Sequence, residues 1–127
     1  MTKSNHLICR KSVELALLWC SLKYGHSIWG VSPIRLNIST KLNCYGRYEP
    51  TGIIRINPSL HKSMIEMINT VIHEYIHHKQ PILIEYTYPR FKETGYTVDT
   101  HPFELEARKI ANRDARVCRN WVLSRLK

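Results

Sequence analysis

Two histidines and a glutamate form the most chemically suggestive pattern in this sequence, an H-E-x-x-H pentapeptide at positions 73–77. Because residues four apart lie on the same face of an α-helix, His73 and His77 can direct two imidazole nitrogens at one point. A tetrahedral Zn²⁺ accepts such nitrogens and leaves room for a third protein ligand and a water. Glu74 can remove a proton from that water, whose pKa zinc lowers to about 7. The pattern predicts a zinc-dependent hydrolytic centre with Glu74 as catalytic base; the alternative is an amphipathic helix with solvated histidines.

A catalytic zinc of this kind needs a third protein ligand from outside the pentapeptide. Suitable side chains downstream are those of Glu85, Glu93, His101, Glu104 and Glu106. Glu104 lies near the start of a predicted helix with an apolar face, so packing can hold it rigidly. Glu106 is two positions further along that helix and points elsewhere. The residue types therefore favour Glu104, with His101 as the alternative third ligand.

The size and composition of the chain are those of one soluble globular domain. At 127 residues it is long enough for a modest core, and we expect a single domain over residues 1–127. Its apolar share of 43% and charged share of 23% are ordinary for such a domain. The formal charge of +9 at pH 7 favours anionic partners such as nucleic acid, an acidic protein or a membrane surface. The alternative is a solvated surface that only improves solubility.

The cysteines and the N-terminal residues bear on where the protein works. The four cysteines, at positions 9, 20, 44 and 118, are scattered and form no C-x-x-C pair, so we expect reduced thiols that lie mostly in the core. The apolar stretch 13–22 contains Glu14, is too short to span a bilayer and is not followed by a small-residue cleavage site. We therefore expect a cytoplasmic protein without a membrane partner.

The two ends of the chain have helical patterns. Residues 7–24 are rich in apolar side chains, so we expect a core helix covered on most sides, with Gly25 at its C′ position. Residues 102–126 predict a last helix with one apolar face and an arginine-rich remainder. Between the motif helix and the last helix, residues 82–88 alternate as in a short strand and residues 89–99 are typical of a loop.

The helix that carries the motif has predicted ends. Asn57 is typical of an N-cap, Pro58 of the first helical position, and Pro81 ends the helix shortly after the motif. The apolar stripe expected in the core comprises Leu60, Met64, Ile68, Val71, Ile72, Tyr75 and Ile76. His78 points about 100° away from the neighbouring His77, so we expect it on the surface.

Alternating patterns predict a small sheet. Residues 34–38 and 53–56 alternate as half-buried strands do, with Asn57 directed outward, and residues 45–48 supply a middle strand. We therefore expect an α+β fold. Its small, mainly antiparallel sheet of about three strands packs on the active-site helix, an N-terminal core helix and a C-terminal helix.

Four short motifs follow one another along the chain in a distinctive order. They are a G-x-Y-x-P turn at 46–50, I-x-I-N-P at 54–58, H-E-x-x-H at 73–77 and E-x-E-A at 104–107. This order resembles the small gluzincin-type zinc metallopeptidases, and is most similar to minigluzincins and to SprT-like and ImmA/IrrE-like domains. The resemblance covers most of the chain, although only H-E-x-x-H is individually specific.

The resemblance implies roles for several residues. In gluzincins the first glutamate of the E-x-E-A segment binds the metal, which by this match is Glu104. SprT-like proteins use a third histidine, which corresponds to His101, although the residues around it fit that pattern poorly. Many gluzincins carry an acidic residue four positions after the ligand, which orients a zinc-binding histidine. Arg108 stands there in this chain, so that support must come from elsewhere or be absent; Glu66 and Glu106 are candidates.

The resemblance also implies a substrate cleft. The strand at 53–56 would form its upper edge and bind an extended peptide through main-chain hydrogen bonds; the alternative is an ordinary edge strand. Arg90, Tyr96 and His101 lie in the region of the sequence expected to supply a group that stabilises the oxyanion.

These patterns predict a zinc-dependent endopeptidase, with Zn²⁺ as cofactor and a protein or peptide as substrate. SprT-like enzymes digest proteins attached to DNA, and the charge of +9 would suit a peptidase acting on nucleic-acid-associated proteins. The alternative is a basic nucleic-acid-binding protein with a non-catalytic or vestigial zinc site, indicated by the net charge and the arginine-rich last helix.

Overall fold

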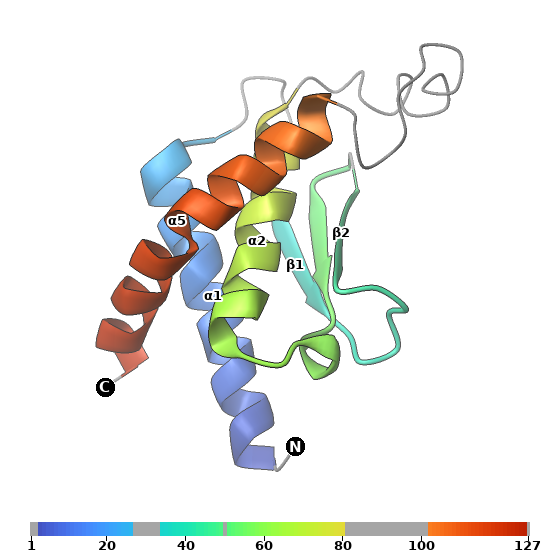
Figure 1. Ribbon diagram of the computed structural model, residues 1–127. Helices are drawn as coiled ribbons and strands as arrows, with labels where there is room; N and C mark the ends of the chain where they lie inside the picture. Colours follow the sequence, from blue (N-terminus) through green and yellow to red (C-terminus); the bar gives the residue numbers. More distant parts are fainter. Residues whose placement is uncertain (1–2, 27–33, 50, 81–101, 127) are drawn as a thin grey trace.

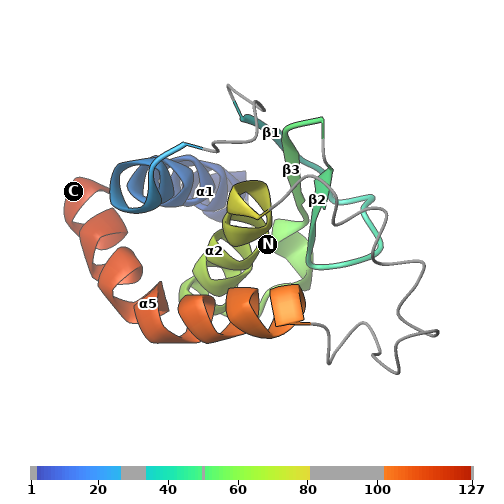
Figure 2. The same cartoon turned by 90° about the horizontal axis from the view of Figure 1, so that it is seen from above.

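A computed structural model describes residues 3–26, 34–49, 51–80 and 102–126, with side chains from residue 10 onward. The helices in these ranges are α1 (Lys3–Tyr24), the short 3-10 helix η1 (Pro58–Leu60), α2 (Met64–Lys79) and α5 (Pro102–Leu126). The strands are β1 (Arg35–Ile38), β2 (Gly46–Glu49) and β3 (Ile53–Ile56). Helix α2 lies at the centre, with α1 and α5 against it and the sheet beside it (Figures 1 and 2). The predicted α+β class is confirmed.

The sheet is mixed, which differs from the mainly antiparallel sheet that we expected. Its strand order is β1-β3-β2, with β3 parallel to β1 and antiparallel to β2. The strand predicted to be the middle one is β2. It comes between β1 and β3 in the sequence, but in the described sheet it lies at the edge and β3 is central. Ile54 and Ile56 of β3 have no exposed surface, because β3 lies between the other two strands and their side chains face the core. Gly52, with φ of +95°, closes the hairpin between β2 and β3.

The segment between the sheet and α2 corrects two expectations. Asn57 is buried rather than directed outward, because its amide donates hydrogen bonds to the carbonyl oxygens of Thr40 and Leu42. Asn57 does cap a helix, but only the 3-10 helix η1. The motif helix begins later, at Met64, where Ser63 is the N-cap and accepts a hydrogen bond from the backbone of Glu66.

The N-terminal helix is less covered than its composition suggested. Leu18 and Leu22 of α1 are 48% and 70% exposed, and Leu60 of the expected apolar stripe is 42% exposed. The C′ position is as predicted, since Gly25 has φ of +79°. Free thiols at Cys20, Cys44 and Cys118 agree with the expected reduced state; the first and last are buried in the core and Cys44 is partly exposed.

A buried carboxylate joins α1 to α5 and predicts an acid-sensitive part of the stability. Asp114 accepts hydrogen bonds from the Tyr24 hydroxyl at 2.6 Å and from Arg113, and the Arg113 guanidinium holds the pKa of Asp114 below its usual value. A depressed pKa stabilises the fold above the unfolded-state pKa of about 3.9, and this contribution is lost as pH falls below it.

Asp114→Asn should therefore lower the free energy of unfolding by about 1–2 kcal/mol at pH 7. The difference from the wild type should shrink below the unfolded-state pKa. Urea titrations at pH 7 and at acid pH measure it. A difference that does not depend on pH would contradict the charged role of Asp114.

The close approach of β2 to α2 depends on a glycine. A Cβ atom at Gly46 would lie 2.6 Å from the Thr70 methyl group and 3.0 Å from Ile56 Cδ1. Gly46→Ala should push β2 away from α2 and lower the free energy of unfolding by about 1–3 kcal/mol, as overpacking does. Thermal unfolding measures the loss. Adding Thr70→Ser, which removes the methyl group and keeps the hydroxyl, should restore part of it; no restoration would contradict the steric cause.

Candidate metal centre

Three predicted ligands come together between α2 and α5. The ligand atoms of His73, His77 and Glu104 all lie within 4.8 Å of one another. Nε2 of His77 is 3.1 Å from Oε2 of Glu104, and Nε2 of His73 pairs with Oε1 of the same carboxylate. Both imidazoles thus present the same type of nitrogen to one carboxylate. Two imidazole nitrogens and a carboxylate at this spacing could hold a metal ion.

Packing of the two helices fixes these side chains. His73 and His77 are one helical turn apart on α2, with ring centroids 4.9 Å apart. The opposite side of α2 is anchored by Ile68, Ile72 and other core residues with no exposed surface. Glu104 comes from the first turn of α5, which packs along α2. The three side chains are 9–17% exposed, so few other conformations are open to them.

The electrostatics of the cluster suit a cation. Burial alone would raise the pKa of Glu104, but hydrogen bonds from His73 and His77 hold that pKa far below its usual value. Burial would lower the pKa of His77, yet the hydrogen bond to Glu104 and the nearby charge of Glu74 raise it overall. Glu104 is therefore ionised, as a metal ligand must be, and the surroundings favour positive charge between the three side chains.

Glu74 has the surroundings of a proton acceptor rather than a ligand. It follows His73 on α2, is 9% exposed, and does not belong to the ligand cluster. Burial raises the pKa of Glu74, while the nearby His77 and His73 and a hydrogen bond from the backbone of Tyr48 lower it in part. A raised pKa makes this carboxylate a better proton acceptor than an exposed glutamate.

Sequence reasoning missed Gln80, which supports His77. Oε1 of this buried side chain is 2.7 Å from Nδ1 of His77, and an amide oxygen can only accept, so Nδ1 carries a hydrogen and donates it there. A metal bound in place of the Nε2–Glu104 contact would then take the Nε2 lone pair. The Gln80 amide donates to the carbonyl oxygen of Phe103 at 2.8 Å and to the Glu106 carboxylate at 3.1 Å. Only its position one turn after His77 could have signalled this role.

Gln80 also supplies the support for a metal-binding histidine that is missing at position 108, where Arg108 replaces an acidic residue. The expected acidic support is replaced for His77 by an amide, and Glu106 takes part only through that amide. Glu66, the other candidate, lies in the first turn of α2, about 10 Å along the helix axis from His73. Glu66 is therefore too far away to orient either imidazole.

Removing the Gln80 amide should weaken metal binding. We expect Gln80→Leu to lower zinc affinity by about 10–100-fold, the usual effect of losing a partner behind a metal ligand. Competition with a coloured chelator measures the affinity. Asn69→Ala is the matched control, because the Asn69–Asn112 hydrogen bond also joins α2 to α5 but touches no ligand. Equal zinc affinity in Gln80→Leu and wild type would contradict the role of Gln80.

His78 is buried, although we expected it on the surface. It is 2% exposed, and its Nδ1 lies 3.2 Å from the hydroxyl of Tyr48. The ring also contacts the Tyr75 ring, and burial lowers the pKa of His78. The expectation was wrong because β2 covers this side of α2, which helical geometry alone could not reveal.

The strand beside the metal centre is β2 rather than β3. The sequence 53–56 was expected at the cleft edge, but β3 is paired on both sides. Within the described ranges β2 is paired only with β3, and its Tyr48 contacts Glu74 through the backbone and His78 through the side chain. Within those ranges, the edge next to the cluster that has no neighbouring strand is therefore that of β2.

Several predicted residues lie outside the described ranges. They are the alternative ligand His101, the oxyanion candidates Arg90 and Tyr96, and the segments 82–88 and 89–99. Comparison of the chain with protein-family models, curated proteins and solved structures finds no match. The assignment of the site consequently rests on its own geometry.

Proposed function

We propose that this chain is a zinc-dependent endopeptidase. The observation that carries the proposal is the meeting of His73, His77 and Glu104 within 4.8 Å, with Glu74 beside them. Two imidazoles and one carboxylate suit zinc, and three protein ligands leave the fourth position that a catalytic site needs. The resemblance to gluzincin-type metallopeptidases agrees with this ligand set.

The residues divide the chemistry between them. Bound zinc would lower the pKa of a water and polarise the scissile carbonyl. His73, His77 and Glu104 would hold the ion, and Gln80 would keep His77 in the binding tautomer. Glu74 would accept the proton of the water and pass it to the departing amine, for which its raised pKa is suited.

The edge of β2 that has no neighbouring strand among the described residues supports a peptide as the substrate. An extended peptide can pair with such an edge through main-chain hydrogen bonds, and because β2 runs beside α2 from Thr70 to His78, it would lie along that helix. The contact between Tyr48 and Glu74 places this edge next to the proposed base. Strand addition recognises the peptide backbone, which accords with an endopeptidase.

The test is zinc-dependent cleavage of an unfolded protein. Purified protein loaded with one equivalent of zinc should cut an unfolded substrate, and mass spectrometry in ¹⁸O-labelled water should find one heavy oxygen per new carboxyl group. A chelator should stop the reaction and zinc should restore it. A zinc-loaded protein that cuts no unfolded protein or peptide would overturn the proposal.

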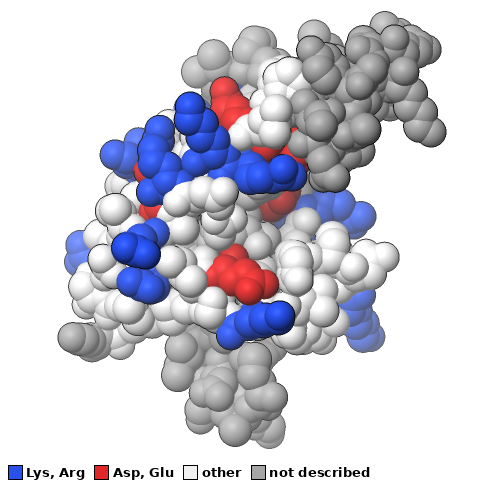
Figure 3. All heavy atoms as spheres, in the orientation of Figure 1, with Lys and Arg blue, Asp and Glu red and all other residues white. Residues whose placement is uncertain are grey.

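The charge of α5 favours a second candidate, a nucleic-acid-binding protein with a non-catalytic zinc site. Helix α5 has exposed basic side chains at Arg108, Lys109, Arg113, Arg116 and Arg125, and basic atoms gather over it in Figure 3. None of the described helices combines the length and apolar character needed to cross a membrane. DNA binding that weakens steeply with salt and survives chelation would support this candidate. If cleavage also occurs, the two functions combine in a peptidase acting on nucleic-acid-associated proteins.

A further inference from the structure

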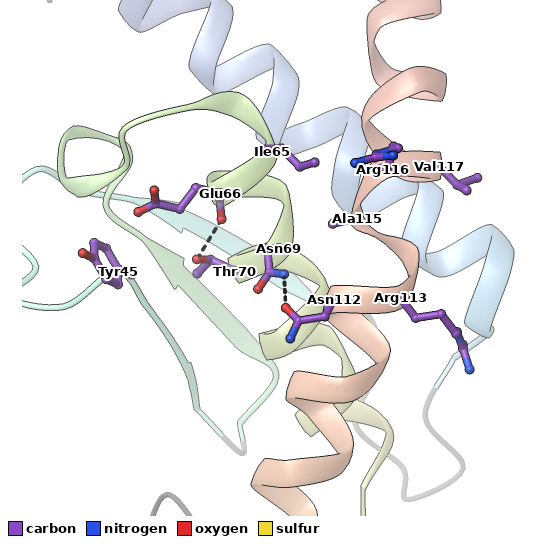
Figure 4. Close-up of a pocket in the computed structure, with 10 residues that line it drawn as sticks. All are labelled: Tyr45, Ile65, Glu66, Asn69, Thr70, Asn112, Arg113, Ala115, Arg116 and Val117. Carbon is purple, nitrogen blue, oxygen red and sulfur yellow. Dashed lines mark hydrogen bonds between the residues drawn. The ribbon is translucent and has the colours of Figure 1, made fainter.

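An open pocket of about 680 Å³ lies between α2 and α5 and adjoins Tyr45, ahead of β2 (Figure 4). The residues that matter here are Tyr45, Glu66, Asn69, Thr70, Asn112 and Arg116. None of them is a predicted metal ligand. The pocket therefore needs an explanation of its own.

Helical geometry relates this pocket to the metal centre. Glu66, Thr70, His73 and His77 follow one another at intervals of four, three and four residues, so they share one face of α2. From His73, Thr70 is about 5 Å and Glu66 about 10 Å along the axis. An extended peptide covers about 3.3 Å per residue. A peptide held at the metal and running along this face would place a side chain in the pocket within about three residues of the cleaved bond.

The polar groups of the pocket are mostly satisfied by one another. Asn69 donates to Asn112 at 2.8 Å, and Thr70 is bonded to the Glu66 backbone and to His61 at 2.9 Å. The Glu66 carboxylate differs, because in the described part of the chain it forms no hydrogen bond or ion pair. Glu66 is only partly exposed and projects toward the side where Tyr45 lies (Figure 4). The pocket thus offers an unneutralised carboxylate.

The neighbouring ring points to a cation as the missing partner. Tyr45 is 52% exposed, with its centroid 5.1 Å from that of His61. A carboxylate and an exposed aromatic face together suit a lysine or arginine side chain, through an ion pair and a cation–π contact. Two arginines of α5 also line the pocket, but Arg113 is paired with Asp114. Arg116, across the pocket from Tyr45 in Figure 4, forms no ion pair with Glu66. The net charge of +9 repels cations at long range, but salt screens it beyond about 8 Å.

We propose that this pocket is a specificity site that takes a lysine or arginine side chain of the peptide substrate, with Glu66 as the residue that selects it. The inference rests on the proposed peptidase function. It adds a substrate class, peptides with a basic residue within three positions of the cleaved bond.

Matched fluorogenic peptides test the selection. They differ only in carrying Lys, Leu or Glu at one of the three positions on either side of the cleaved bond. For the zinc-loaded wild type we expect kcat/KM about 10-fold higher for Lys than for Leu at one position, which corresponds to about 1.4 kcal/mol. Glu66→Gln should bring this ratio to about 1, and Glu66→Lys should favour the Glu peptide. Gln at position 66 keeps the helix-capping pattern, so the fold should persist.

Control and binding measurements separate the two proposals. Glu14→Gln removes the same charge from the exposed side of α1 and should leave the Lys/Leu ratio at the wild-type value. Binding of the same peptides to zinc-loaded Glu74→Gln protein, followed by fluorescence anisotropy, needs no cleavage. Lys-selective binding that depends on Glu66, without cleavage by wild type, would uphold the pocket and overturn the peptidase. Wild-type cleavage without Lys preference, or a preference that survives Glu66→Gln, would overturn the pocket.

Discussion

Glu74→Gln is expected to abolish peptide hydrolysis while zinc stays bound. Gln has the same shape and still accepts a hydrogen bond from the Tyr48 backbone, but it cannot take a proton from water. Loss of a general base lowers kcat by about 10²–10⁴-fold. Because Glu74 does not belong to the ligand cluster, the metal content should remain one ion per chain. Steady-state kinetics and elemental analysis of the same sample measure both quantities.

The opposite pattern would be equally informative. If Glu74→Gln loses its zinc, Glu74 is needed for metal binding, and its role as general base is not supported. If kcat falls by less than about 10-fold, another group serves as the base. Glu106→Gln is a suitable comparison, since it removes a carboxylate two positions from Glu104 that lies behind Gln80 and not at the reacting water.

Glu104→Ala is expected to remove metal binding together with activity. His73 and His77 alone would keep two of the three donors, so zinc affinity should fall by more than the roughly 100-fold expected for residues behind the ligands. Wild type at a free zinc concentration 100 times the Kd should gain about 2.7 kcal/mol of stability, and Glu104→Ala should gain almost none. Thermal unfolding with and without zinc measures the difference.

His101→Ala decides between the two predicted ligand schemes. If Glu104 is the third ligand, His101→Ala keeps zinc-dependent stabilisation and Glu104→Ala loses it. The reverse result would favour the SprT-like scheme and would contradict the cluster of His73, His77 and Glu104. The carboxylate of Glu104 already pairs with both imidazoles, which supports the first outcome.

The parts of the site that sequence could predict are those that follow from one helix. His73, Glu74 and His77 are set by a fixed spacing on α2, and Glu104 by a start signal and an apolar face on α5. Gln80 could not be found this way, since its partners Phe103 and Glu106 belong to another helix. Helical spacing predicts which face of α2 a side chain lies on, but it does not predict which residues of other elements pack against that face.

For the fold, too, the sequence predicted features within one element but not how the elements are arranged. Alternation predicted which strand residues face inward, but it does not say which strands are neighbours, and the order β1-β3-β2 could not be read from it. At the start of the motif helix two signals compete, Asn57-Pro58 and Ser63 with Glu66. Both are used, the first for a short 3-10 helix and the second for α2, because the chain turns between them.

The division of the ligands between α2 and α5 gives a bound ion a mechanical role. An ion held by His77 and Glu104 would close residues 78–103 into a loop, as a covalent cross-link does, and so reduce the freedom of the unfolded chain. The first turn of α5 would then be fastened to α2 at two places, by the ion and by the Gln80 amide. Metal occupancy would thereby determine the stability of the folded chain as well as its catalytic activity.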